Sequence, residues 1–145
     1  MKLTMNNRTV IILRGVPGNG KTTLAKFFEL IADMSELTFM LCCADEWFED
    51  EQGNYNFKQE ELHKAHSWCK NQFKSALDGL IDLVVVANTN VRSDDVKIYR
   101  NLAIEAQYRV FVLTVENWHE GIDVHNVPNE VKEKMKKSLL ASIRL

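Results

Sequence analysis

A stretch near the amino terminus, residues 15–22, combines residue types and spacing that suit phosphate chemistry. It fits the pattern G-x-x-x-x-G-K-[ST] through Gly15, Val16, Pro17, Gly18, Asn19, Gly20, Lys21 and Thr22, and Thr23 completes the predicted binding stretch. Because glycine has no Cβ, its backbone N–H groups can approach an anion closely. Lys21 would reach the β- and γ-phosphates of ATP, and the Thr22 hydroxyl would ligate Mg²⁺. The stretch predicts a triphosphate site, with a chance glycine turn as the alternative.

A carboxylate follows the second apolar run of the chain. Residues 38–43 form a short apolar run that is typical of a strand, and Asp45 comes almost directly after it. At a strand end that faces residues 15–22, which we call the phosphate loop, Asp45 could accept the proton of an attacking hydroxyl, as the general base of a kinase does. The alternative is that Asp45 caps the turn at Trp47. Its neighbour Glu46 is interpreted as a solvated side chain.

An asparagine-rich triplet follows the third apolar run. Residues 81–87 are the most strand-like segment, and Asn88, Thr89 and Asn90 come directly after them. We predict that Asn88 and Asn90 contact the phosphate acceptor, and Asn88 would also suit a metal-bound water. Because asparagine is common in turns, turn formation is an equally good interpretation of the triplet.

Strand-like and helix-like segments alternate along the chain and must position these polar residues. Apolar β-branched runs predict strands, and apolar residues at helical spacing predict helices between them. The predicted strands cover residues 8–14, 38–43, 81–87 and 108–115, and the predicted helices cover 21–34, 56–80 and 93–107 and start again at Pro128. Asn56 and Ser93 are the predicted caps of the second and third helices. The alternation predicts an α/β fold, a four-stranded parallel sheet flanked by helices.

The carboxyl ends of parallel strands share one edge of a sheet, and ligands bind beyond that edge. Four loops should therefore converge on one mouth, namely residues 15–22, 45–46, 88–90 and 116–127. We call residues 116–127 the lid loop. It is polar, irregular and directly precedes the last predicted helix.

The composition is that of an ordinary globular chain. With 145 residues, 46% of them hydrophobic and 26% charged, residues 1–145 are expected to form a single domain. The net charge of −2 argues against a strongly basic surface for nucleic acid. Apolar runs are too short for a membrane span, and residues 1–7 lack a signal-peptide core. Three cysteines, two of them adjacent, argue against a disulfide framework, so we expect a reduced, cytoplasmic setting.

The motifs, in this order, resemble a known group of enzymes. Residues 14–23, then 44–46, then 88–90 are similar to the P-loop kinases related to the 5′-hydroxyl kinase domain of phage polynucleotide kinase. The similarity spans nearly the whole chain. It implies transfer of the γ-phosphate of ATP, and it implies that Asp45 is the general base, because the first acidic residue after the second strand has that role in the group.

The chain departs from that group at three places. The triplet after the third strand usually begins with aspartate, and here it begins with Asn88. An arginine that helps hold the acceptor usually lies three residues beyond the general base, where this chain has Phe48. The lid usually supplies arginines to the γ-phosphate. Here residues 116–127 contain none and offer only His119 and His125 as potential cations, both interpreted as surface histidines.

Other notable residues have plain structural interpretations. Trp47 or Phe48 could stack a base, with core packing as the alternative for at least one of them. Arg14 precedes the phosphate loop and could pair with an acid. Arg92 and Lys132 are interpreted as solvated side chains.

The sequence therefore predicts a P-loop kinase that uses ATP and Mg²⁺ and phosphorylates a hydroxyl, with Lys21 and Asp45 as catalytic residues. The predicted acceptor is a polynucleotide or nucleoside 5′-hydroxyl. One alternative is a small-molecule or nucleotide kinase, and another is a degenerate ATP-binding module without turnover. The oligomeric state stays open.

Overall fold

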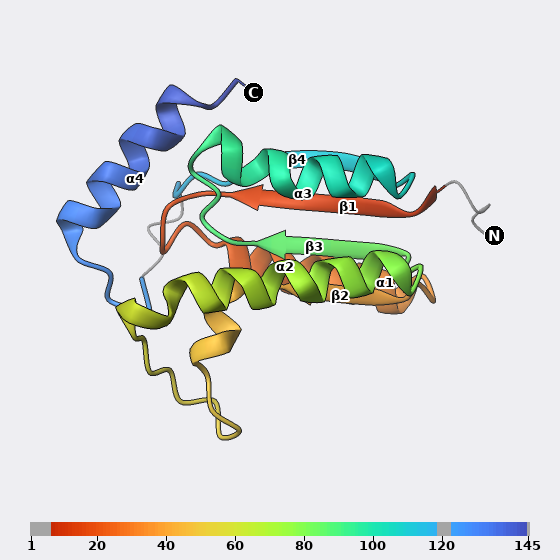
Figure 1. The fold of residues 1–145 in the computed structure, drawn as a ribbon, viewed down its shortest axis with the longest axis horizontal. Coiled ribbons are helices and arrows are strands. Elements are labelled where there is room, and N and C mark those ends of the chain that lie inside the picture. The colour runs from red at the N-terminus through yellow and green to blue at the C-terminus, as the bar shows by residue number, and fades with distance from the viewer. Residues whose placement is uncertain (1–6, 119–122, 145) are drawn as a thin grey trace.

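The computed structural model describes residues 7–118 and 123–144. Strands and helices alternate as predicted, and Figure 1 shows the helices arranged around the sheet. The strands are β1 (Thr9–Arg14), β2 (Phe39–Cys42), β3 (Leu83–Ala87) and β4 (Arg109–Thr114). The helices are α1 (Lys21–Met34), α2 (Leu62–Asp78), α3 (Ser93–Glu105) and α4 (Asn129–Ala141), with short 3-10 helices η2 (Ala44–Phe48) and η3 (Gln59–Glu61).

The four strands form one parallel sheet in the order β2-β3-β1-β4, which confirms the predicted fold class. β1 is paired on both sides, with Ile11 opposite Val85 of β3 and Phe111 of β4. The connection after β1 leads to β2 at one edge of the sheet and the connection after β3 leads to β4 at the other edge, so the switch point lies between the carboxyl ends of β1 and β3. In open α/β sheets this is where ligands bind, and it is where the glycine-rich stretch begins.

Different helices pack on the two faces of the sheet. Helix α1 covers one face, where Ala25 and Ala32 pack with the buried residues Ile11, Leu13 and Val85. Helices α2 and α3 cover the other face, and Figure 1 shows both of them in front of the sheet. Every residue of β3 is buried, as expected for a strand covered on both faces. No helix of the described residues has the length and apolarity needed to cross a membrane.

Local details of two helix starts differ from the sequence-based expectation. α2 begins at Leu62 after the 3-10 turn, so Asn56 is not its cap, and the N–H of Asn56 instead donates to the carbonyl of Phe48. α3 begins at Ser93, as predicted, but Ser93 is its first helical residue and Arg92 is the N-cap. On α2, His66 is exposed, and Ala65 occupies the buried position of that turn.

Arg14, the last residue of β1, is fully buried and pairs with no acid among the described residues. Its Nε donates to the carbonyl of Asn90 at 2.8 Å, and Nη2 donates to that of Val91 at 3.3 Å. The same guanidinium donates to the carbonyl and the hydroxyl of Ser142, at 2.8 and 2.7 Å. Arg14 thus joins the end of β1 to the loop after β3 and to the residue that follows α4.

Replacing Arg14 by Met should lower the free energy of unfolding by about 3 kcal/mol, because several buried carbonyls lose a charged donor. Chemical denaturation measures the change. The matched control is Arg92→Met, since the Arg92 side chain is 68% exposed. An Arg14 variant as stable as that control would contradict a structural role for the buried guanidinium.

Candidate functional site

The phosphate loop has backbone geometry that favours glycine. Gly18 and Gly20 have φ angles of 86° and 93°, in the left-handed region that side chains disfavour. A Cβ on Gly15 would lie 2.8 Å from the carbonyl oxygen of Val115, so the close approach of that strand end also requires glycine. Gly20 is the N-cap of α1, and the positive end of the helix therefore faces the loop.

Lys21 folds back onto the loop that precedes it. Its Nζ donates to the carbonyls of Gly15 at 2.8 Å and Val16 at 3.0 Å. Burial lowers the pKa of Lys21 to about 8, although the charges of the Asp45 and Asp123 carboxylates act in the opposite direction. The ammonium group is therefore desolvated, and an anion in the loop would be a strong partner for it.

The loop is held from three sides. The N–H of Gly15 donates to the carbonyl of Thr89 at 3.0 Å. Asn19 is buried and its amide donates to the carbonyl of Val115 at 2.9 Å. Asn90 is also buried, has a φ of 45°, and donates to the carbonyl of Leu13 at 2.8 Å. The ends of β3 and β4 thus fix the phosphate loop in place.

Asp45 is the second residue of η2, whose N-cap is Cys43, so Asp45 is not the cap of that turn. Its side chain is 48% exposed, and one oxygen, Oδ2, lies 3.7 Å from Nε2 of His125. The other oxygen, Oδ1, accepts from the hydroxyl of Tyr55 at 3.5 Å. Burial, and then the charge of Asp45, raises the pKa of Tyr55 to about 12, so this hydroxyl keeps its proton at neutral pH.

The predicted acceptor residues Asn88 and Asn90 both have partners within the protein. Asn88 is buried, its Oδ1 accepts from the N–H of Ala44 at 2.8 Å, and its Nδ2 donates to Sγ of Cys69 at 3.4 Å. Asn88 therefore anchors the start of η2, directly before Asp45. An acceptor contact by Asn88 or Asn90 stays a prediction, and their observed contacts support the loops of the mouth.

Two residues of the lid loop, Asp123 and His125, make contacts that the sequence did not indicate. Asp123 accepts from the N–H groups of His125 at 3.0 Å and Val127 at 2.8 Å, and its carboxylate lies 3.6 Å from Nζ of Lys132. A Cβ on Gly18 would lie 3.1 Å from the N of Asp123, so the lid loop packs directly on the phosphate loop. His119 lies outside the described residues.

Only a search for side-chain-to-backbone turns could have revealed Asp123, because aspartate commonly bonds N–H groups a few residues ahead. The interpretation of Lys132 as a solvated side chain is wrong, because its ammonium group contacts this carboxylate. His125 is likewise more than a surface histidine, because its side chain is only 25% exposed and faces Asp45.

The predicted metal ligand Thr22 lies in the first turn of α1 and is exposed. Within residues 7–118 and 123–144, no three His, Cys, Asp or Glu side chains cluster in a way that could hold a metal. A single hydroxyl beside an anion site still suits Mg²⁺, which commonly takes one or two protein ligands together with phosphate oxygens and water. The thiols of Cys42, Cys43 and Cys69 are free, and burial raises the pKa of each.

Three other predicted residues lie near the mouth. Phe48 is buried in the core, which confirms the packing interpretation for one of the two aromatic residues. Trp47 is 38% exposed, and its Nε1 donates to Oε2 of Glu61 at 3.3 Å. The Arg92 guanidinium is solvated, as predicted, and lies 3.9 Å from a carboxylate oxygen of Asp94.

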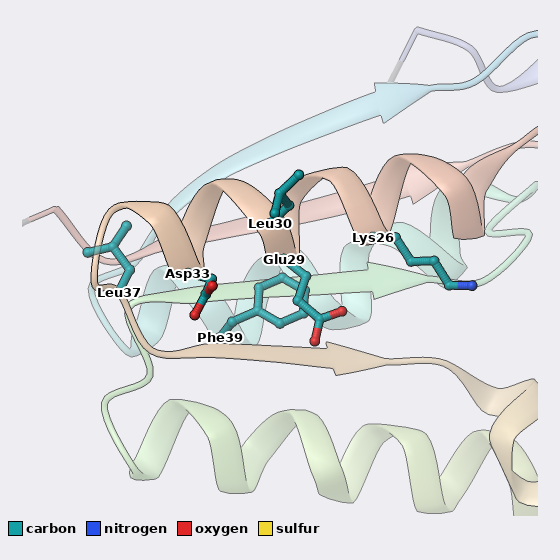
Figure 2. A pocket seen from close by; sticks show the side chains of 6 residues that line it. All are labelled: Lys26, Glu29, Leu30, Asp33, Leu37 and Phe39. Atoms are coloured by element: carbon teal, nitrogen blue, oxygen red, sulfur yellow. The ribbon is translucent and has the colours of Figure 1, made fainter.

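An open groove of about 430 Å³ lies along the outer side of α1 beside β2 (Figure 2). Figure 2 shows that its side chains come from α1 and from the chain that enters β2. The groove is lined by Lys26, Glu29, Leu30, Asp33, Leu37 and Phe39. None of the predicted site residues lines it, so the groove is separate from the mouth.

A family model described as an AAA domain matches residues 10–139, nearly the whole chain. The chain belongs to this AAA domain family. Human NEDD4-binding protein 2 is 27% identical to it over 134 residues, which are 90% of this chain and 7% of that protein. The chain therefore spans a small part of this relative's length.

Solved structures share the fold of this AAA domain at low sequence identity. One is the Pnkp1/Rnl/Hen1 RNA repair complex, with a TM-score of 0.68 and 18% identity, covering 94% of this chain and 45% of that one. Another is the APS kinase of Mycobacterium tuberculosis in complex with AMPPNP and APS, with a TM-score of 0.54 and 13% identity, covering 95% and 73%. The AAA domain therefore has a P-loop fold of the kinase type, and the phosphate acceptor is not determined by these similarities.

Proposed function

We propose that this AAA domain is an ATP-dependent kinase that transfers the γ-phosphate to a hydroxyl. The proposal rests on the proximity of Lys21 and Asp45 at the carboxyl edge of the sheet. Lys21 is desolvated on the phosphate loop, and Asp45 is close enough for its charge to act on the Lys21 ammonium. A phosphate-binding cation and a half-exposed carboxylate are the two groups that phosphoryl transfer to an alcohol requires.

Each residue has a stated role in the proposal. The N–H groups of residues 15–20 and the Lys21 ammonium bind the β- and γ-phosphates, with Thr22 and Thr23 at the start of α1 beside them. The acceptor oxygen forms a bond to the γ-phosphorus while the bond from that phosphorus to the β-phosphate oxygen breaks and ADP leaves. Asp45 takes the proton of the hydroxyl. Mg²⁺, held by Thr22 and phosphate oxygens, would neutralise phosphate charge.

The proposed acceptor is the 5′-hydroxyl of a nucleic-acid end or of a nucleoside. The motif order around Asp45 and Asn88 supports it, as does the shared fold with the RNA repair complex. The half-exposed Trp47, two residues before the acidic run that begins at Glu49, offers an aromatic surface for a terminal base. A small-molecule hydroxyl is the second candidate, supported by the fold shared with APS kinase.

The charge balance predicts a short contact with nucleic acid. The chain has 18 basic and 20 acidic residues, and its lid loop contains no arginine. A long cationic track would make affinity fall steeply with salt, whereas engagement of one to a few nucleotides would not. We therefore expect a nucleoside 3′-phosphate, a short 5′-hydroxyl oligonucleotide and a long one to be phosphorylated at similar kcat/KM.

Transfer of labelled phosphate to these three acceptors, each at low and high salt, measures this expectation. A strong preference for the long oligonucleotide that disappears at high salt would contradict a contact with only a few nucleotides. If none of the three is phosphorylated while ATP still binds, the acceptor is a small molecule or the AAA domain binds ATP without turnover. ATP hydrolysis measured without any acceptor is the baseline for all three.

A further inference from the structure

We propose that His125 is a positioning residue that holds the Asp45 carboxylate from the lid loop. The inference rests on the proposed kinase function, because it assigns to His125 the alignment of the general base. In this arrangement the base is aligned only while residues 123–127 lie over the phosphate loop. The lid then acts on the reaction through the carboxylate in addition to covering the nucleotide site.

The first support is that two groups hold different oxygens of the same carboxylate. Nε2 of His125 lies 3.7 Å from Oδ2 of Asp45, and the hydroxyl of Tyr55 lies 3.5 Å from Oδ1. The rings of Tyr55 and His125 are in contact, with centroids 4.1 Å apart. Both distances are long for hydrogen bonds, as is common in sites that tighten when substrate binds. Each oxygen of the carboxylate therefore faces a different neighbouring group.

The second support is the buried side of the imidazole. Nδ1 of His125 is buried and has no hydrogen-bond partner within the described residues. A buried N–H without an acceptor costs more than a buried lone pair without a donor, so the neutral ring is best placed with its hydrogen on Nε2. That hydrogen then faces Asp45. The burial of one nitrogen thereby selects the tautomer that can donate to the base.

The third support is the placement of residues 123–127, the described end of the lid loop. The Asp123 carboxylate accepts from the N–H groups of His125 and Val127, and Lys132 of α4 lies beside it. The backbone of Asp123 also packs on Gly18. His125 is therefore set over Asp45 by the same residue that contacts the phosphate loop, so a movement of this loop changes both contacts together.

The group that faces Oδ2 of Asp45 comes from the lid loop and not from η2. Position 48 is occupied by a buried phenylalanine, so no cation next to Asp45 comes from η2. His125 approaches Asp45 from a distant part of the chain instead.

The test compares four variants of the whole chain with the acceptor that the parent phosphorylates best. His125→Ala should lower kcat by about 10- to 100-fold, since a misplaced reacting group costs up to that much, with little change in the Kd for ATP. His125→Gln should restore most of kcat, because its amide can donate to Asp45. His66→Ala, an exposed histidine of α2, is the matched control and should behave as the parent. In an Asp45→Asn background, His125→Ala should cause no further loss.

A readout independent of turnover is the ¹⁵N NMR spectrum of the imidazoles. The parent should show His125 with a protonated Nε2 and an unprotonated Nδ1, and Asp45→Asn should change that signal while leaving His66 unchanged. If the parent has no turnover with any acceptor, the kinase proposal fails. The NMR spectrum then tests the contact between His125 and Asp45 by itself. The inference is overturned if His125→Ala keeps or raises kcat, if its loss adds fully to that of Asp45→Asn, or if Asp45→Asn leaves the His125 signal unchanged.

Discussion

Replacing Asp45 by Asn is expected to lower kcat by about 10²–10⁴, the usual contribution of a general base, while the Kd for ATP stays nearly constant. The amide keeps the size of the side chain but cannot take the proton of the acceptor hydroxyl. Asp45 is half-exposed at the mouth, so its loss should not unfold the chain. Single-turnover kinetics and equilibrium binding of ATP measure the two quantities separately.

The neighbouring residue offers a matched control for this change. Glu46 is an exposed carboxylate of the same 3-10 helix, and Glu46→Gln removes an equal charge one residue away. We expect that control to keep kcat within about twofold. Retained turnover in Asp45→Asn, or equal losses in both variants, would show that Asp45 acts only through structure or general charge.

Replacing Lys21 by Ala should abolish productive use of ATP and most of the stabilisation that ATP gives. At 100 times its Kd a ligand stabilises the folded chain by about 2.7 kcal/mol, which is roughly a 10 °C rise in Tm for a chain of this size. The variant has no ammonium at the loop carbonyls that Lys21 now contacts. Thermal unfolding with and without Mg-ATP measures the difference.

The Lys21 prediction has a pH signature with a defined sign. Burial lowers the pKa of Lys21 from 10.5 to about 8, so at pH 8.5 much of the empty protein carries a neutral amine. Phosphates favour the ammonium, so ATP binding takes up protons above pH 8 and affinity falls as pH rises through that value. For the empty protein, the unfolded chain binds more protons between about 8 and 10.5, so this group makes stability rise with pH there.

Calorimetry in two buffers of different ionisation enthalpy, at pH 7 and pH 8.5, detects the proton uptake. Lys26→Ala is the control, since Lys26 lies on the outer groove of α1. Equal ATP stabilisation of the parent and Lys21→Ala would remove the phosphate-loop assignment. Equal proton uptake at both pH values would show that Lys21 is not the titrating group.

Local patterns predicted the fold because each element carries its own signal. The run that became β1 and the spacing that became α1 depend on neighbours within a few residues, and α1 has the predicted bounds, Lys21–Met34. Alternation then required parallel strands and a common mouth. The predicted start of α2 was wrong because asparagine suits both helix caps and loops. In the structure a 3-10 turn precedes the helix, and the helix begins after it.

The site was less accessible to sequence reasoning because its contacts join distant residues. Tyr55 reaches Asp45 across ten positions, and His125 reaches the same carboxylate from the lid loop. Neither residue lies in a periodic pattern or a motif. The phosphate loop was recognised because one continuous stretch contains nearly all of it, whereas the surroundings of Asp45 are assembled by the sheet.

The buried guanidinium of Arg14 has a consequence for the order in which the chain completes its structure. Contacts close in sequence form early, whereas this side chain meets Ser142, a partner 128 residues away. During synthesis, β1 and the phosphate loop emerge first, but the last donors of Arg14 have no acceptor until α4 has emerged. Until α4 docks, the guanidinium therefore lacks its Ser142 acceptors, and the base of the phosphate loop is completed only by that late contact.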